Sequence, residues 1–253
     1  MNNNIVSIIL AAGLGKRMNS DIPKVLQYVN NKRMIFHVID TAIEIGSSNI
    51  LIIVGKYKDI IQDSIFKNYS KDIYDKIHFI IQPEPFGTGN AVYYCIDWLN
   101  NNINKWNTRI LILSGNVPLI SAGTLNYLIN KYPNSNSLLT YKIDNPDGYG
   151  RIVLDFENNT VLKIIEHNEC NHDEQNIHII NCGIYYLDYI TLFHTLPKLC
   201  NRNHAGEYYL TDIVQLSFNK SPFFSVLLPN DKLYEIFNIN NTIDLEIINR
   251  YRQ

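Results

Sequence analysis

Two basic residues, Arg17 and Lys24, follow a glycine-containing turn near the start of the chain. Charged side chains of this kind pair with phosphate oxygens through charge-assisted hydrogen bonds. The turn itself, residues 11–15, consists of small residues apart from one leucine. A ligand could therefore approach its backbone closely, and exposed N–H groups could hold a phosphate. These residue types and their spacing indicate a phosphate-binding loop.

The two best-known phosphate loops do not match this turn. A dinucleotide fingerprint requires G-x-G-x-x-G, and Met18 stands where its third glycine is needed. A P-loop requires Gly and then Ser or Thr at the positions that Leu10 and Arg17 occupy. Taken alone, Gly13 and Gly15 favour an ordinary strand-to-helix connection that carries solvated basic residues.

The elements that must position this turn alternate between strands and helices. Apolar runs predict strands over Ile5–Leu10, Ile50–Val54, Ile77–Ile81 and Arg109–Leu113. Helical spacing predicts helices over Met34–Ile45, Lys58–Phe66, Ala91–Leu99 and Ser121–Tyr132. Such alternation is typical of a parallel sheet with right-handed crossovers. Ligands of such sheets bind beyond the carboxyl ends of the strands, where the loops after Leu10, Ile81 and Leu113 lie.

The second half of the chain is richer in strands. Strands are predicted over Ser137–Tyr141, Arg151–Leu154, Val161–Glu166, Ile177–Tyr186 and Phe223–Leu228. An Asn158-Asn159 turn joins two of them as a hairpin. Helices are predicted over Tyr189–Leu196, Thr211–Asn219 and Thr242–Tyr251. With 253 residues and no long linker, we expect one α/β domain.

Composition excludes several classes of function. The net charge of −2 gives no electrostatic reason to bind nucleic acid or an anionic membrane. No apolar run reaches the roughly 20 residues of a membrane helix, and no targeting segment is visible, so we expect a soluble cytoplasmic protein. Without a C-x-x-C pair a zinc site is not expected, and Cys95 and Cys182 lie in apolar runs as core residues would.

The complete string L-A-A-G-x-G-x-R-M, followed by D-x-P-K, closely resembles the signature of the sugar-phosphate nucleotidyltransferases. In that family the loop wraps a nucleoside triphosphate. The resemblance implies that Arg17 and Lys24 are catalytic residues that contact the phosphates. It also implies that the backbone of four residues packs against the nucleotide, namely Leu10, Ala11, Ala12 and Gly13.

Residues 82–89, with the pattern Q-x-E-x-x-G-T-G, resemble the uracil-binding loop of the uridyltransferases. The resemblance implies nucleotide contacts from Gln82, Gly87 and Thr88. A buried amide such as Gln82 both donates and accepts, so it can pair with one edge of a base. Thr88 could bond a ligand or cap the helix that follows. Each residue taken singly also fits a Pro/Gly turn before a helix.

Two further segments imply a magnesium site. Residues 114–119 resemble the family pattern G-D-x-P-L, which implies nucleotide contacts from Ser114 and Gly115. Asn116 stands where the family has the aspartate that holds Mg²⁺. Residues 235–241 resemble E-x-x-G-V-N-N, in which Asn240 corresponds to the other metal ligand. The resemblance therefore implies Mg²⁺ as cofactor, held here by two neutral amides.

Four more segments resemble the sugar-binding parts of the family: P-x-G-Y-G-R-I, I-x-E-H, N-[TS]-G-I and G-E-Y-Y-x-T-D. They imply contacts to sugar hydroxyls from Glu166 and to the sugar from Asn181. A glutamate at a strand end is otherwise most often just solvated. Tyr209 and Thr211 would flank an acetamido group, with Thr211 also capping a helix, and Gly150 would lie in the turn that faces the sugar.

The matches run in order from Leu10 to Asn241 and are closest to the uridyltransferase half of the bacterial bifunctional N-acetylglucosamine-1-phosphate uridyltransferases. The resemblance implies a Rossmann-like, mostly parallel mixed sheet flanked by helices. It implies a nucleotide lobe of about residues 1–115 and a β-rich sugar lobe with a C-terminal helix of about residues 116–253. We do not expect the left-handed β-helix that follows this half in those enzymes.

The implied partners are UTP and N-acetylglucosamine 1-phosphate, which would give UDP-N-acetylglucosamine and diphosphate. Two alternatives stay open. One is transfer to another sugar phosphate or from another base. The other, suggested by Asn116, is a UDP-sugar-binding protein without turnover. A Rossmann oxidoreductase is disfavoured by the failed fingerprint, and the sequence leaves monomer and dimer equally open.

Overall fold

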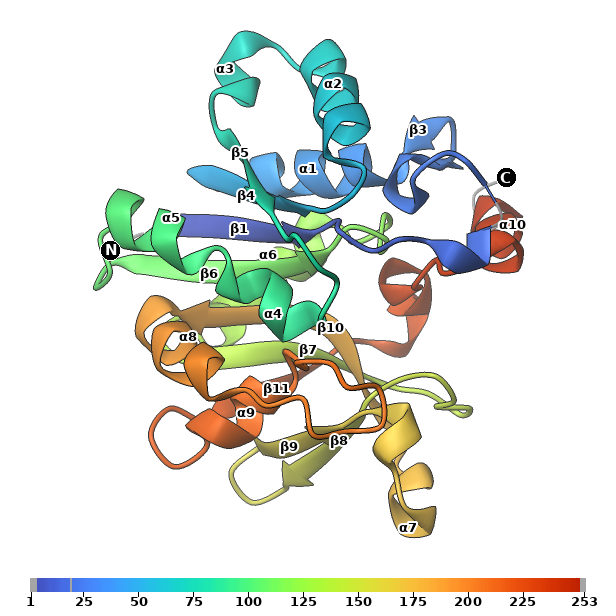
Figure 1. Ribbon diagram of the computed structural model, residues 1–253. Coiled ribbons are helices and arrows are strands. Elements are labelled where there is room, and N and C mark those ends of the chain that lie inside the picture. The colour runs from blue at the N-terminus through green and yellow to red at the C-terminus, as the bar shows by residue number, and fades with distance from the viewer. Residues whose placement is uncertain (1–3, 19, 251–253) are drawn as a thin grey trace.

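A mixed sheet of nine strands runs through the computed structural model, which describes residues 4–18 and 20–250 apart from the side chain of Lys16. Its strand order is β5-β4-β1-β6-β10-β7-β11-β9-β8 (Figure 1). The strands are β1 (Asn4–Leu10), β4 (Asn49–Val54), β5 (Ile77–Ile81), β6 (Thr108–Ser114), β7 (Asn136–Lys142), β8 (Arg151–Asp155), β9 (Thr160–Ile165), β10 (Ile179–Asp188) and β11 (Phe223–Leu227).

The first half of the sheet is parallel and the second half is mixed. β1 pairs in parallel with β4 and β6, and β4 with β5. β10 runs antiparallel to both β6 and β7, while β11 returns parallel to β7. β8 and β9 form an antiparallel hairpin whose tip contains Asn159 at a φ of 53°, which confirms the predicted Asn158-Asn159 turn.

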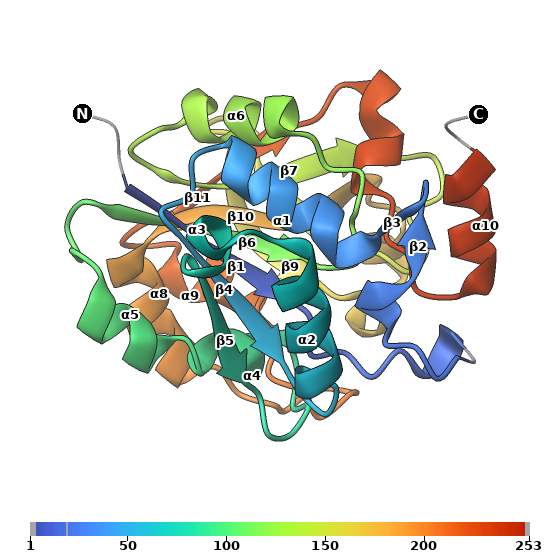
Figure 2. The ribbon, with the colours of Figure 1, turned by 90° about the horizontal axis from the view of Figure 1, so that it is seen from above.

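Helices cover both faces of the sheet (Figure 1 and Figure 2). One face carries α1 (Met34–Glu44), α2 (Lys58–Asn68) and α6 (Ala122–Lys131). The other carries α4 (Thr88–Tyr93), α5 (Ile96–Asn102), α8 (Tyr189–Thr195) and α9 (Asp212–Ser217). The shorter helices are α3 (Lys71–Tyr74), α7 (His172–Gln175), and the 3₁₀ turns η1 (Lys16–Met18), η2 (Lys24–Leu26), η3 (His167–Glu169), η4 (Leu196–Lys198) and η5 (Asn230–Ile236).

Side chains alternate along the central strands and so fill two separate cores. Ile9 on β1 packs with the helices of the α1 face, whereas its neighbour Ile8 packs with the α4 face. Both are fully buried, which explains why this strand is apolar at nearly every position. The exception is the buried Ser7, whose hydroxyl bonds that of Ser47 at 2.7 Å. Cys95 and Cys182 are buried in these cores, as their apolar surroundings predict.

A small hairpin holds the end of the chain against its beginning. β2 (Tyr28–Val29) and β3 (Lys32–Arg33) form a two-stranded sheet beside the last helix, α10 (Thr242–Arg250) (Figure 2). Val29 and Ile248 are fully buried together in a third small core that also contains Ile239. The backbone N–H of Asn30 donates to Asn249 Oδ1 at 2.9 Å. This packing carries residues 238–240 to the carboxyl end of β1.

The structure confirms the predicted α/β fold and most predicted elements, with local differences. The helix predicted over Ala91–Leu99 is two helices, because the N–H of Cys95 bonds the carbonyl of Val92, three residues back, and this tightens the turn between α4 and α5. β10 lies two residues later than predicted. Tyr251, the predicted end of the last helix, lies outside the described residues.

Candidate active site

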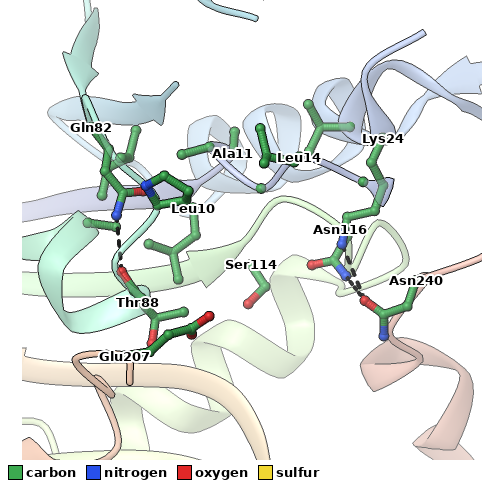
Figure 3. A pocket seen from close by; sticks show the side chains of 18 of the residues that line it. Leu10, Ala11, Leu14, Lys24, Gln82, Thr88, Ser114, Asn116, Glu207 and Asn240 are labelled. Carbon is green, nitrogen blue, oxygen red and sulfur yellow. Dashed lines mark hydrogen bonds between the residues drawn. The ribbon is translucent and has the colours of Figure 1, made fainter. Parts of the chain in front are cut away.

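A cavity of about 590 Å³ opens beyond the carboxyl ends of β1, β5 and β6 (Figure 3). The loops after these three strands supply most of its walls, which is the position that a parallel sheet predicts for a ligand. Twelve of the predicted phosphate, nucleotide and metal residues line it, namely Leu10, Ala11, Ala12, Gly13, Arg17, Lys24, Gln82, Gly87, Thr88, Ser114, Asn116 and Asn240. Leu14 and Gly15 join them from the phosphate loop.

 The structure thus brings the residues predicted for phosphate, base and metal binding to one space.

Gly115 does not line the cavity but allows the strand ends to approach each other. Its N–H donates to the carbonyl of Leu10 at 3.0 Å. A Cβ atom at this position would lie 2.8 Å from that same carbonyl oxygen, closer than real contacts allow. The N–H of Ala11 in turn donates to Ile53 on β4 at 2.9 Å. A glycine after β6 is therefore needed for the phosphate loop to take its place.

Arg17 and Lys24 reach the cavity from the two short turns η1 and η2. Arg17 is exposed, whereas Lys24 is partly buried. Burial and the nearby charge of Arg17 lower the pKa of Lys24 to about 8, although Asp244 opposes the shift. Lys24 Nζ donates to Asn240 Oδ1 at 3.2 Å. An anion that entered the cavity would favour the charged form of this lysine.

Asn116 and Asn240, the two predicted metal ligands, lie in direct contact. Asn116 Nδ2 donates to Asn240 Oδ1 at 3.2 Å, to Asn238 Oδ1 at 2.7 Å and to the carbonyl of Ile239 at 3.0 Å. The nitrogen of Asn116 therefore faces the C-terminal segment, and its oxygen faces the cavity in Figure 3. Asn238 belongs to the same amide cluster, because its oxygen accepts from Asn116.

The ligand atoms of this cluster match only part of what a magnesium ion requires. Mg²⁺ takes oxygen ligands, and amide oxygens qualify, but it is usually held by one or two carboxylates and by substrate phosphates. Asn240 Oδ1 already accepts from Lys24 and Asn116, so only the oxygen of Asn116 remains uncommitted. The described residues contain no group of three or more His, Cys, Asp or Glu that could hold a metal. The donor set fits an ion that arrives on phosphates, and it does not fit one held by the protein alone.

The amide of Gln82 is buried, with 5% of the residue exposed, and is held from two sides. Its nitrogen donates to the carbonyl of Gly87 at 3.1 Å and to Asn90 Oδ1 at 2.9 Å. The prediction that this amide offers both a donor and an acceptor is therefore wrong in part. Its two N–H groups serve the loop, and its oxygen is what remains for a ligand.

Gly87 and Thr88 are tied to a distant segment, residues 207–210. Gly87 has a φ of 107°, and a Cβ atom there would lie 2.6 Å from the carbonyl oxygen of Tyr208, so only glycine fits. Thr88 was predicted as a possible helix cap, but Gly87 occupies the cap position. Thr88 Oγ1 instead accepts from the N–H of Leu210 at 3.1 Å, which leaves its own hydrogen free.

Four predicted sugar-binding residues form a cluster next to the cavity, without lining it. Thr211 Oγ1 donates to Glu166 Oε1 at 2.8 Å, whereas it makes no cap bond to the helix that follows. Thr211 therefore occupies the predicted N-cap position of α9, but its side chain does not cap the helix, because its hydroxyl donates to Glu166. A Cβ atom on Gly150 would lie 3.7 Å from Glu166 Oε2 and 3.7 Å from the Cβ of Asn181. The three strands β8, β9 and β10 thus bring this cluster together.

The cluster is unusually rich in acidic groups. Burial raises the pKa of Glu166, and the charges of Asp212, Glu207 and Glu169 raise it further, while the hydrogen bond from Thr211 opposes them. Burial and three of these carboxylates, Glu169, Glu166 and Glu207, also raise the pKa of Tyr209, which places this predicted residue close to the same group. Neutral hydrogen-bond donors, such as hydroxyl groups, suit these surroundings.

Asn181 is only partly available to a ligand. Its oxygen accepts from the N–H of Gly183 at 3.0 Å, and its nitrogen donates to the hydroxyl of Tyr185 at 2.7 Å. The second N–H of the Asn181 amide remains available to a ligand. Seven residues that line the cavity are not among the predicted site residues, namely Leu14, Gly15, Val25, Ile53, Pro85, Ala91 and Glu207. Glu207 belongs to the motif G-E-Y-Y-x-T-D, from which only Tyr209 and Thr211 were predicted to contact the sugar.

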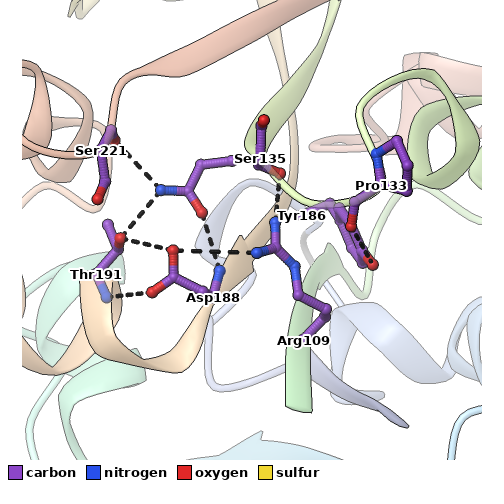
Figure 4. Close-up of polar contacts among 8 residues, drawn as sticks. Arg109, Pro133, Ser135, Tyr186, Asp188, Thr191 and Ser221 are labelled. Carbon is purple, nitrogen blue, oxygen red and sulfur yellow. Dashed lines mark hydrogen bonds and ion pairs between the residues drawn. The ribbon is translucent and has the colours of Figure 1, made fainter. Parts of the chain in front are cut away.

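A second polar cluster, drawn in Figure 4, lies around Arg109 at the start of β6, whereas the cavity lies at the other end of this strand. Arg109 donates to the carbonyl of Ser135, forms an ion pair of 4.0 Å with Asp188 and stacks over the ring of Tyr186 at 4.7 Å. Asp188 caps α8, because its carboxylate accepts from the N–H of Thr191 at 2.6 Å and from the hydroxyl of Thr191 at 2.9 Å. These contacts join β6, β7 and β10, so the cluster is structural.

Comparison with known proteins agrees with the geometry. The model of the family named Nucleotidyl transferase matches residues 6–231. A protein of Acanthamoeba polyphaga mimivirus, named a probable UDP-N-acetylglucosamine pyrophosphorylase, is 38% identical over 247 residues, which cover 95% of this chain and 93% of that protein.

A solved structure of UDP-glucose pyrophosphorylase complexed with UDP-glucose has the same fold. It superposes with a TM-score of 0.76 at 17% identity and covers 98% of each chain. No helix among the described residues is long and apolar enough to cross a membrane. On the family match and the viral relative, the chain belongs to the nucleotidyl transferase family, among the sugar-phosphate nucleotidyltransferases that its motifs predict.

Proposed function

We propose that this protein is an N-acetylglucosamine-1-phosphate uridyltransferase. It converts UTP and N-acetylglucosamine 1-phosphate into UDP-N-acetylglucosamine and diphosphate. The relative of 38% identity carries a name for this activity, which supports the choice of both substrates. In this proposal roughly residues 1–115 form the nucleotide lobe and roughly residues 116–253 the sugar lobe of a single domain.

The observation that carries the proposal is the path of residues 207–211. Tyr208 bonds Gly89, and Leu210 bonds Thr88, which lines the nucleotide cavity. Thr211, one residue further, donates to Glu166 in the neighbouring acidic cluster. One short segment therefore joins a cavity suited to a nucleotide with a cluster suited to sugar hydroxyls. A reaction between a nucleotide and a sugar phosphate needs two such sites side by side.

The reaction is a phosphoryl transfer without a covalent enzyme intermediate. An oxygen of the sugar phosphate attacks the α-phosphorus of UTP, and the bond from that phosphorus to the bridging oxygen of diphosphate breaks. Arg17 and Lys24 neutralise the charge that collects on the departing diphosphate. Leu10 to Gly13 hold the nucleotide, the oxygen of Gln82 accepts from the base, and Ser114 and Gly115 support the ribose side.

Magnesium is part of the proposal, and Asn116 and Asn240 would hold it together with the phosphates. Its chemistry is the neutralisation of charge on the transferred and departing phosphates. Both ligands from the protein are neutral, so we expect the ion to bind mainly with the triphosphate. Glu166, Asn181, Tyr209, Thr211 and Gly150 would hold the sugar.

Asn116 also favours a second candidate function. A homologue that lacks the family carboxylate could hold a UDP-sugar while turning it over slowly. Release of diphosphate, measured in a coupled assay with Mg²⁺, separates the candidates. Turnover with UTP and N-acetylglucosamine 1-phosphate that exceeds turnover with glucose 1-phosphate or galactose 1-phosphate supports the proposal. Tight binding of UDP-N-acetylglucosamine without release of diphosphate supports the second candidate.

A further inference from the structure

Glu207 contributes the one carboxylate among the described residues that line the cavity. Figure 3 shows its side chain on the wall opposite the phosphate loop, between Thr88 and Ser114. The cavity also contains the cations Arg17 and Lys24, but no ion pair joins either of them to Glu207 in the described part of the chain. The catalytic scheme above gives this residue no role.

The backbone of Glu207 is held firmly in place. Its N–H donates to Asn203 Oδ1 at 3.1 Å, and its carbonyl accepts from Asn203 Nδ2 at 2.6 Å. The next residue, Tyr208, donates to the carbonyl of Phe86 at 2.8 Å and accepts from the N–H of Gly89 at 2.8 Å. A side chain on such a fixed support is pre-organised to contact a ligand.

The carboxylate itself has no hydrogen bond or ion pair to any other described residue, although the residue is partly buried. An ionised carboxylate can only accept hydrogen bonds, so it needs a donor from the ligand. A phosphate beside it would be repelled, because both groups are negative. The group of a nucleotide sugar that suits this position is a hydroxyl.

We propose that Glu207 is a specificity-determining residue that accepts hydrogen bonds from hydroxyl groups of the bound sugar nucleotide. This inference rests on the proposed function. Both the ribose and the hexose carry such groups, and Glu207 lies between the two sites. It lines the nucleotide cavity, and its negative charge also raises the pKa of Glu166 in the sugar cluster.

Calorimetric titration of the whole protein tests the inference without relying on turnover. UDP, 2′-deoxy-UDP and UDP-N-acetylglucosamine are titrated into the wild type and into Glu207→Ala and Glu207→Gln. If Glu207 contacts the ribose, the wild type prefers UDP over 2′-deoxy-UDP by about tenfold or more, and Glu207→Ala loses this preference. If it contacts the hexose, the ratio of the affinity for UDP-N-acetylglucosamine to the affinity for UDP is instead lower in Glu207→Ala than in the wild type, by about tenfold or more.

Two variants serve as controls. Glu207→Gln keeps an uncharged acceptor, so its loss should be intermediate. Glu84→Ala removes an exposed carboxylate from the neighbouring loop that does not line the cavity, and it should leave both ratios unchanged. Ratios in Glu207→Ala within twofold of those in the wild type overturn the inference. Failure of the wild type to bind any of the three ligands overturns the proposed function as well, which distinguishes the two failures.

Discussion

Asn116 Nδ2 donates a hydrogen bond of 3.2 Å to Asn240 Oδ1, although 124 positions separate the two residues. Lys24 Nζ donates to the same oxygen at 3.2 Å. Three parts of the chain, the phosphate loop, the end of β6 and the segment before α10, therefore meet at one amide oxygen. The ammonium group of Lys24 therefore lies beside the amides that we propose as ligands of Mg²⁺.

Replacement of Asn116 by aspartate is expected to make the protein depend on magnesium. Aspartate cannot donate to the three acceptors that Asn116 bonds, so without metal the free energy of unfolding should fall by about 1–3 kcal/mol. With Mg²⁺ and UTP present, the new carboxylate should bind the ion. The Tm should then recover, and kcat should rise about tenfold, which corresponds to ~1.4 kcal/mol.

Thermal denaturation with and without Mg²⁺, together with the diphosphate assay, measures both effects. Asn116→Ala is the matched control, since it loses the same hydrogen bonds and adds no carboxylate. It should be destabilised without any recovery on addition of Mg²⁺. Equal responses of the two variants to Mg²⁺ would show that the ion does not bind at Asn116.

The charge of Lys24 should set an alkaline limit on activity. Its pKa of about 8 means that the free protein carries this charge below pH 8 and loses it as the pH rises through that value. Because the charged form binds phosphate, kcat/KM for UTP should fall above about pH 8. Lys24→Arg should remove this limit, since a guanidinium stays charged. A pH profile of Lys24→Arg that matches the wild type would argue against this role.

Arg17→Ala should reduce kcat by two or more orders of magnitude, because its charge meets the charge that develops on diphosphate. Arg17 is exposed, so the Tm should stay within about 1 °C of the wild type. Arg33→Ala is a suitable control, since Arg33 lies over the ring of Tyr28 outside the cavity. Activity of Arg17→Ala within a few-fold of the control would refute the catalytic assignment.

Gln82 should favour UTP over CTP for a reason that its hydrogen bonds supply. Both N–H groups of its amide are used by Gly87 and Asn90, so only an oxygen acceptor faces the base. Uracil offers a donor at N3, whereas cytosine offers an acceptor there. Competition between UTP and CTP should show a clear preference for UTP, and Gln82→Ala should weaken it. Equal use of both by the wild type would contradict this prediction.

Thr211→Val should weaken use of the sugar phosphate. The substitution removes the hydroxyl that donates to Glu166 and leaves a carboxylate oxygen without that partner. At saturating UTP, kcat/KM for N-acetylglucosamine 1-phosphate should fall by about tenfold or more. The pKa of Glu166 should rise further, because the one contact that lowers it is lost. Thr211→Ser keeps the hydroxyl and should behave as the wild type; an equal loss in both variants would point to packing instead.

Local patterns in the sequence determined the elements of the fold. Apolar runs such as Ile5–Leu10 can be recognised because a strand buried on both faces needs apolar side chains at nearly all of its positions. Apolar side chains at helical spacing predicted α1, α2 and α6, because a helix that packs on a sheet needs apolar side chains along one face. Motifs then placed the candidate phosphate, base and metal residues in loops, and the structure brings these loops together at one edge of the sheet.

Tertiary structure decided which partner each polar side chain takes. Thr211 was predicted to cap its own helix, but Glu166, 45 positions away, accepts its hydroxyl. Thr88 bonds Leu210, 122 positions away, and the donors of Gln82 turn inward to Asn90. A side chain forms its hydrogen bond with whichever group the packed sheet brings within about 3 Å. That choice depends on strand order and on contacts between distant segments, which no local pattern in the sequence contains.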